Sequence, residues 1–175
     1  MKRIKKSNVP IPKDAKAKKS KSLLIGIIFV LVICFTVLII FIENNGGKLT
    51  ISNKTDLKLE YVKMNYVYQE GPLSDPLLFE NINPNTNTFS TLEEIDFNNL
   101  KANLEVRFKF ENYDEMFVDA GYFNTLFDGN VKIVFAEAEG DNLVIKVKAS
   151  NGILPSPTID CNEEFIIYLS EGYVE

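Results

Sequence analysis

The chain has 175 residues, a formal net charge of −5 and 46% hydrophobic residues, and it contains no histidine and no tryptophan. One folded domain of ordinary size is expected for this length. The lack of histidine excludes a Ser-His-Asp triad, a Cys-His pair, a histidine metal ligand and a histidine pH switch.

The charge is divided between two opposite parts of the chain. Nine basic residues and one acidic residue precede Leu23, whereas ten basic and twenty-three acidic residues follow from Glu43 onward. The first part therefore carries a net charge of +8 and the second a net charge of −13. An uncharged segment separates the two parts.

This uncharged segment, residues 23–42, reads LLIGIIFVLVICFTVLIIFI. As a helix it spans about 30 Å, which is the thickness of a bilayer's hydrocarbon core. The sequence predicts a transmembrane helix that acts as an uncleaved signal anchor. One alternative is a buried core helix, although a soluble helix normally keeps a polar face. The other is a cleaved signal peptide, although this apolar run is longer than usual and lacks the small residues of a cleavage site.

The basic residues before the apolar run set its expected orientation. The positive-inside rule places residues 1–22 in the cytoplasm as a basic, disordered tail and residues 43–175 outside the cell membrane. Residues 43–48 are expected to be a short linker, and residues 49–175 an extracytoplasmic domain. The lipid bilayer is thus the first expected partner.

The outer part shows the period of two that is typical of β-strands with one buried face. It is clearest over residues 100–110, where apolar residues alternate with charged or polar ones, and it recurs at 131–135 and 143–148 with turn residues between them. Further strands are expected at 49–53, 57–68, 77–80, 86–91 and 165–169. In 57–68 the apolar phase changes, which indicates a β-bulge near Tyr61.

These strands predict an antiparallel β-sandwich of immunoglobulin-like or transthyretin-like shape. Short helices are also conceivable at 92–99 or 113–117. Asn53-Lys54-Thr55 has the pattern of a glycosylation acceptor, but we interpret it as a turn.

Cys34 is expected in the middle of the membrane and Cys161 in the outer part of the chain, so the two cysteines cannot pair. An outer domain without an internal disulfide, in a chain rich in lysine, asparagine and isoleucine, indicates a Gram-positive bacterium rather than an animal source. Cys161 is expected to be buried as a small apolar residue, with an intermolecular disulfide or a free thiol as the alternatives.

Candidate sites are few. Asp114, Glu115 and Asp119 lie close together in an aromatic stretch, and carboxylates in loops can bind Ca²⁺, so these three are the candidate calcium ligands. Their spacing does not match an EF-hand. No residue pattern indicates a catalytic group, and no cofactor is expected.

We therefore expect a single-pass membrane protein that presents a non-enzymatic outer domain for protein interaction or envelope-complex assembly. The net charge of the outer part opposes binding to nucleic acid and suits cations or a basic protein surface. The alternatives are a small hydrolase that uses carboxylates or a Ser-Lys pair, and a purely structural envelope component.

Overall fold

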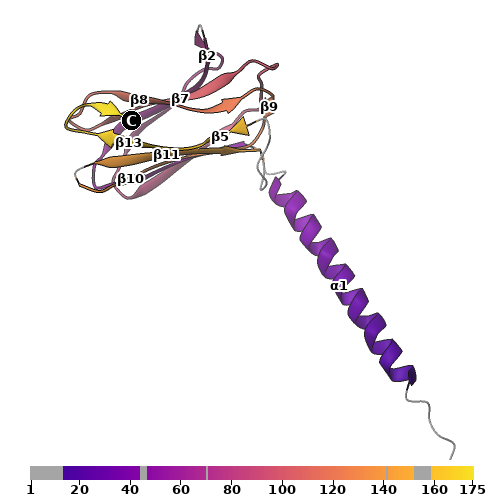
Figure 1. Ribbon diagram of the computed structural model, residues 1–175. Helices are drawn as coiled ribbons and strands as arrows, with labels where there is room; N and C mark the ends of the chain where they lie inside the picture. Colours follow the sequence, from indigo (N-terminus) through magenta and orange to yellow (C-terminus); the bar gives the residue numbers. More distant parts are fainter. Residues whose placement is uncertain (1–13, 44–46, 70, 141, 152–158) are drawn as a thin grey trace, which may run out of the picture. The chain divides into compact units, whose positions relative to one another are not determined.

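The computed structural model describes residues 14–43, 47–69, 71–140, 142–151 and 159–175. The chain divides into two compact units, Met1–Ile42 and Glu43–Glu175, and each is treated by itself. Figure 1 shows the elements of both units in the colours of the sequence.

The first unit contains the helix α1 (Asp14–Glu43), whose side chains are described from residue 23 to residue 38. The helix begins within the segment expected to be a disordered tail, because residues 14–22 are rich in alanine and lysine, which favour helices, and Asp14 suits a helix N-terminus. The first thirteen residues of that tail lie outside the described residues. In the part of the chain that is described, no helix is both long and apolar enough to cross a membrane.

The second unit is mainly β and contains two six-stranded sheets. Sheet A has the order β14-β13-β11-β10-β1-β5. Its strands are β1 (Gly47–Lys54), β5 (Thr86–Leu92), β10 (Asn130–Glu137), β11 (Leu143–Ser150), β13 (Asn162–Tyr168) and β14 (Tyr173–Val174).

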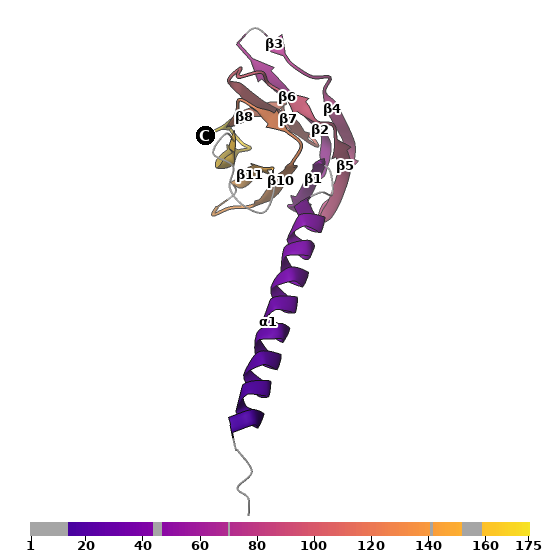
Figure 2. The same cartoon turned by 90° about the vertical axis from the view of Figure 1, so that its right-hand side faces the viewer.

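Sheet B has the order β12-β8-β7-β2-β3, with β4 also paired to β2. Its strands are β2 (Leu59–Tyr68), β3 (Gly71–Pro72), β4 (Leu77–Ile82), β7 (Ala102–Phe110), β8 (Met116–Phe123) and β12 (Ile159–Asp160). The short strands β6 (Ile95–Asp96) and β9 (Leu126–Phe127) form a separate pair. Figure 2 shows sheets A and B as two layers, with β4 and β5 together along one side.

The two layers share one hydrophobic core. On β7 every second side chain, from Ala102 to Phe110, is fully buried, as the alternation in the sequence predicts. Phe108 of sheet B lies edge-on to Phe135 of sheet A, with ring centroids 5.1 Å apart. A second aromatic cluster surrounds Tyr66 and includes Phe123. Aromatic burial on this scale explains how the unit stays folded without a disulfide.

The prediction of a wholly antiparallel arrangement is wrong at one pair. Strand β1 runs parallel to β10, with Lys48 opposite Asn130 and Lys54 opposite Ala136. Parallel neighbours need a long crossover, and five of the six strands of sheet B lie between β1 and β10 in the sequence. Strand periodicity shows which face is buried but contains no information about the direction of a distant partner.

Strand β8 also differs from expectation, because the sequence allows a short helix over 113–117. The structure instead has a turn followed by a strand from Met116, whose inward side chains are Met116, Val118 and Ala120. By contrast, the predicted bulge in β2 is confirmed, since the β2–β7 register shifts between Leu59 and Tyr61.

A buried polar cluster closes the end of β1. The Asn53 amide nitrogen donates to the carbonyl oxygens of Leu57 (2.8 Å), Asn83 (3.2 Å) and Ile82 (3.3 Å). Its oxygen accepts from the hydroxyl and the backbone N–H of Thr55. Asn53 and Lys54, which were expected in a turn, belong to β1, and the bend begins at Thr55. The buried Asn53 side chain joins this bend to the end of β4.

Candidate functional site

The candidate site arises where one stretch of chain changes sheets. Strand β12 pairs with the end of β8 through Ile159–Phe123 and Asp160–Tyr122. The next strand, β13, leaves sheet B and pairs with β11 in sheet A. Among the described residues, the edge of β8 from Met116 to Asp119 therefore has no strand partner on the side away from β7.

The crossing point is fixed by close packing. Gly121 has φ +71°, and a Cβ atom there would lie 2.4 Å from the Cβ of Cys161. The Gly121 N–H donates to a carboxylate oxygen of Glu163 at 2.9 Å. Cys161 is buried, as predicted, and burial raises the pKa of its thiol to about 12, with Glu163 adding to the effect. A buried, protonated thiol is a packing group here.

A groove of about 480 Å³ lies along the open edge of β8 and is bounded by the last strands of sheet A. Its lining consists of residues 115–119, Phe165 and residues 172–175. Because consecutive residues of β8 line it, the groove exposes both the backbone edge and the side chains of that strand.

Much of the lining is apolar. Met116 and Val118 are buried and form its inner part. Phe117 and Tyr173 remain 51% and 43% exposed, which is unusual for large aromatic side chains next to an intact core. The Tyr173 ring stacks on Tyr168 with centroids 4.7 Å apart. These rings offer an apolar contact surface that the domain itself does not cover.

Three lining residues are acidic, namely Glu115, Asp119 and Glu175. The pKa of Asp119 is raised by partial burial and by Glu105, its neighbour across the β7–β8 pair. The pKa of Glu115 is lowered, chiefly because the Tyr61 hydroxyl donates to it and secondarily because Arg107 lies beside it. The groove therefore combines negative charge with apolar surface.

Arg107 holds one side of the groove in place. Its guanidinium binds both carboxylate oxygens of Glu105 at 2.8 and 2.9 Å and one oxygen of Glu115 at 3.1 Å. It also lies 5.0 Å from the centroid of the Phe117 ring, within cation–π range. This partly exposed network holds the side chains of Phe117 and Glu115 in position at the groove.

The structure brings two of the three candidate calcium ligands to this groove. Glu115 and Asp119 line the groove, whereas Asp114 is exposed in the loop before β8 and does not line it. Across the described part of the chain, no group of three or more Asp, Glu, Cys or His side chains could hold a metal ion. Glu115 is instead engaged with Tyr61 and Arg107.

Sequence reasoning missed the sheet A side of the groove. Phe165 and Tyr173 gave no signal, because only the switch of the chain from β12 to β13 brings them opposite β8. The one available signal was Phe117, a large aromatic residue at an outward position between the inward Met116 and Val118.

Comparison with known proteins gives no match, whether to a family model, to a curated protein or to a solved structure. The fold and the groove therefore define the chain only as a protein with a mainly β domain that has an open strand edge.

Proposed function

We propose that the chain is a single-pass membrane protein whose outer domain, a β-sandwich of immunoglobulin-like or transthyretin-like type, binds an extended apolar and basic segment of a partner protein. In this proposal the segment lies in the groove and adds a strand to the open edge of β8. The domain acts by binding and not by catalysis.

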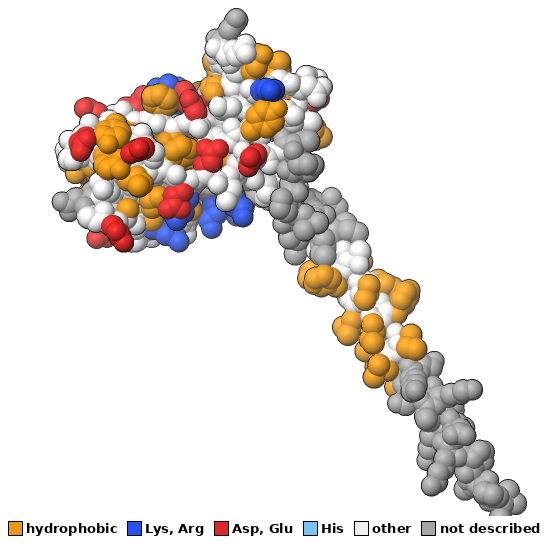
Figure 3. Space-filling model, in the orientation of Figure 1, with side chains coloured by type: hydrophobic (Ala, Val, Ile, Leu, Met, Phe, Trp, Pro, Cys, Tyr) orange, Lys and Arg blue, Asp and Glu red, His pale blue; other side chains and the backbone are white. Residues whose placement is uncertain are grey.

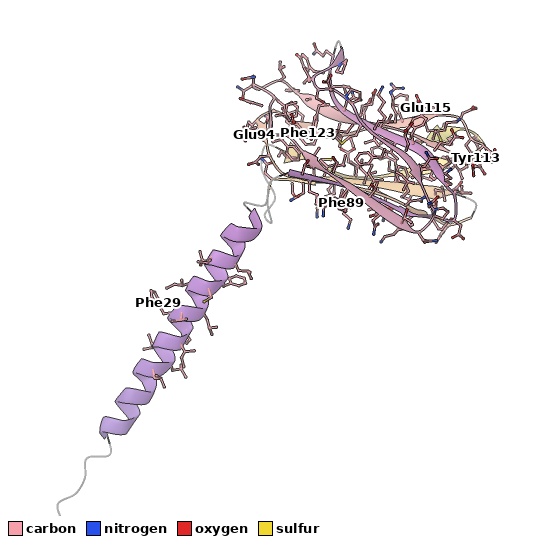
Figure 4. The ribbon with its side chains drawn as sticks, turned by 180° about the vertical axis from the view of Figure 1, so that it is seen from behind. Phe29, Phe89, Glu94, Tyr113, Glu115 and Phe123 are labelled. Carbon is pink, nitrogen blue, oxygen red and sulfur yellow. The ribbon has the colours of Figure 1, made fainter. Side chains whose placement is uncertain are left out.

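Membrane anchoring is supported by the composition of α1. Residues 23–42 contain no charged side chain. The large apolar side chains described in α1, from Leu23 to Leu38, are all exposed and are distributed around the helix, as Figure 4 shows for Phe29 among others. A helix that is apolar on every side is stable only where protein or lipid covers it. The nine basic residues before Leu23 support a cytoplasmic N-terminus.

The unpaired edge of β8 is the single observation that carries the binding proposal. The Gly121 N–H points away from β7, since it donates to Glu163. Backbone N–H groups alternate in direction along a strand, so those of Asp119 and Phe117 point to the same open side. Exposed backbone donors and acceptors on an edge strand are a template for pairing with another chain.

The character of the groove indicates which segment would bind. Its aromatic residues Phe117 and Tyr173 favour alternate apolar side chains, and its acidic residues favour basic ones. The net charge of −13 from Glu43 onward adds long-range attraction for a basic partner. The carboxylates do not form the convergent pair that a hydrolase needs, because Arg107 and Tyr61 occupy Glu115.

The binding mode can be tested with defined peptides and the full chain in neutral lipid nanodiscs. A seven-residue peptide of alternating lysine and valine is compared with a matched peptide of alternating glutamate and valine. We expect only the first to bind and to slow hydrogen exchange at the amides of Phe117 and Asp119. Asp119→Lys should weaken binding at least fivefold, while the control Asp160→Lys, an exposed site on β12, should not. Equal binding of both peptides, or unchanged exchange in β8, would refute the proposal.

Anchoring needs a separate measurement. Full-length protein should stay in the membrane fraction after carbonate extraction, and protease added to protoplasts should digest residues 43–175 while sparing the basic tail. A soluble form beginning after Ile42 would identify residues 23–42 as a cleaved signal instead.

A further inference from the structure

Half of the basic residues of the outer domain lie on one face. Of the ten lysines and arginines from Glu43 onward, five point outward from sheet A on adjacent strands. They are Lys48 and Lys54 of β1, Lys132 of β10, and Lys146 and Lys148 of β11, and all five are exposed. This set is called the lysine face below, and part of it is visible as blue side chains along the lower side of the domain in Figure 3.

The lysine face concentrates like charges instead of neutralising them. Lys132 is directly opposite Lys148 in the β10–β11 register, an arrangement that costs stability when both are charged. The only acidic side chain on the outward positions of β1, β10, β11 and β13 is Glu164, which lies 2.6 Å from Lys146. Among the described residues the other four lysines form no ion pair. In a domain with a net charge of −13, this arrangement points to an anionic surface as its partner.

An exposed aromatic residue lies at the edge of the same face. Phe89 of β5 is opposite Thr50 of β1, an outward position, and is 70% exposed. The ammonium group of Lys48 lies 4.7 Å from the centre of its ring. Figure 4 shows Phe89 on the far side of the domain from Glu115, which belongs to the groove. Aromatic side chains beside lysines are typical of surfaces that enter the headgroup region of a bilayer.

The lysine face begins close to the apolar segment along the chain. Only residues 44–46 separate Glu43, the end of α1, from Gly47, the start of β1. A link of that length reaches at most about 15 Å, because consecutive Cα atoms are about 3.8 Å apart. If residues 23–42 span the bilayer, Lys48 is held at the level of the lipid headgroups.

We propose that the lysine face and Phe89 rest on the anionic phospholipid headgroups of the membrane in which the chain is anchored. This inference depends on the anchoring part of the proposed function. Contact of the lysine face with the membrane leaves the groove available to a partner, because the groove is lined by residues of β8, β13, β14 and their flanks, none of which contributes a lysine to the face. The attraction is electrostatic, so it is expected to weaken as added salt shortens the screening length.

The test uses the full chain with Cys34→Ser and one dye, attached through either Asn87→Cys or Asn103→Cys. Asn87 is exposed on β5 at the edge of the lysine face, and Asn103 is exposed on β7 of the other sheet. The protein is reconstituted in vesicles that contain headgroup-nitroxide lipid, with either 30% phosphatidylglycerol or phosphatidylcholine alone. We expect the dye at position 87 to be quenched at least threefold more than the dye at 103, only in the anionic vesicles and only at low salt.

A charge-reversed variant makes the test specific. Lys132→Glu with Lys148→Glu should abolish the difference between the two dyes, whereas Lys63→Glu with Lys101→Glu, which changes the charge equally on other parts of the domain, should preserve it. Unchanged unfolding midpoints would show that both variants are folded. Equal quenching at positions 87 and 103 in anionic vesicles would overturn the proposal. A response at position 87 to soluble polyglutamate, without quenching by vesicles, would assign the face to a soluble polyanion and overturn it as well.

Failure of the anchor is detected independently. The same protein is floated with vesicles of phosphatidylcholine alone, to which the lysine face should not bind. Flotation without any difference in quenching would refute the docking proposal and leave the anchor intact. Loss of flotation would refute the anchor itself and the docking proposal with it.

Discussion

Replacing Asn53 by alanine removes the polar side chain that joins the end of β1 to the bend after it and to the end of β4. Asn53 is only 1% exposed, and its amide makes three donor contacts and two acceptor contacts. The amide nitrogen has two hydrogens, so at most two donor contacts are strong at one time. The variant therefore loses about four hydrogen bonds and leaves buried carbonyl oxygens without a donor.

At about 1 kcal/mol for each hydrogen bond, Asn53→Ala is expected to lower the free energy of unfolding by about 4 kcal/mol. Urea denaturation of residues 43–175, followed by far-UV circular dichroism, measures this change. Asn87→Ala is the matched control, because Asn87 is exposed on the neighbouring strand β5, and its effect should stay within about 0.5 kcal/mol. A loss below 1 kcal/mol for Asn53→Ala would show that this cluster does not hold the fold together.

Asn53→Asp tests the direction of these hydrogen bonds. The introduced carboxylate would be buried and would face carbonyl oxygens, which raises its folded-state pKa above the unfolded value of about 3.9. Below about pH 4 the carboxyl is protonated in both states and can donate, so the destabilisation is smallest there. As the pH rises toward the folded-state pKa, the carboxyl ionises in the unfolded state but is held protonated in the folded state, so the free energy of unfolding of the variant falls. The stability difference from wild type should thus be smaller at pH 4 than at pH 7, and a constant difference would contradict the assigned donor.

Three further outcomes are expected. Gly121→Ala should cost about 3 kcal/mol of unfolding free energy, because Gly121 has a positive φ and an added Cβ would clash with Cys161. The control Gly140→Ala has a similar φ but open space around it and should cost about 1 kcal/mol, so equal costs would disprove the close packing at the crossing. In the Cys34→Ser background, Cys161 should react with a thiol reagent at pH 8 roughly a thousandfold more slowly in the folded than in the unfolded state, because burial raises the pKa of its thiol to about 12. Rapid labelling of the folded protein would contradict the burial of Cys161. Thermal midpoints in millimolar Ca²⁺ and in excess chelator should agree, and a rise of many degrees that Asp119→Asn abolishes would restore the calcium site.

The buried faces of the strands could be predicted from the sequence, because strict alternation has one physical cause. In β7, β10 and β11 every apolar residue of the alternating set is inward, and the shift of phase in β2 marks the bulge correctly. The buried face of β8 was harder to predict, because Phe117 places an apolar residue at an outward position and interrupts the alternation. Its exposure is related to the groove, where an apolar surface is left uncovered.

The pairing of strands and the site could be predicted only in part. The parallel partner of β1 and the passage of the chain from β12 to β13 depend on how distant segments pack, which local patterns do not contain. Glu115 and Asp119 both line the groove, but Arg107, on another strand, decides what Glu115 does. The lysine face was hidden by the average charge, because its members come from three strands and meet only in sheet A.

The position of β1 in sheet A determines how the domain carries mechanical load. β1 lies between β10 and β5 and is paired with both over most of its length. If residues 23–42 anchor the chain and a partner binds the groove, as proposed, movement of the partner would place tension on the domain at Gly47, the first residue of β1. A pull along the axis of a strand held on both sides stretches all its hydrogen bonds together instead of breaking them one after another from the end. Under such a pull, β1 would be better placed to resist extraction than a strand that is paired on one side only, because it is hydrogen-bonded to both β10 and β5.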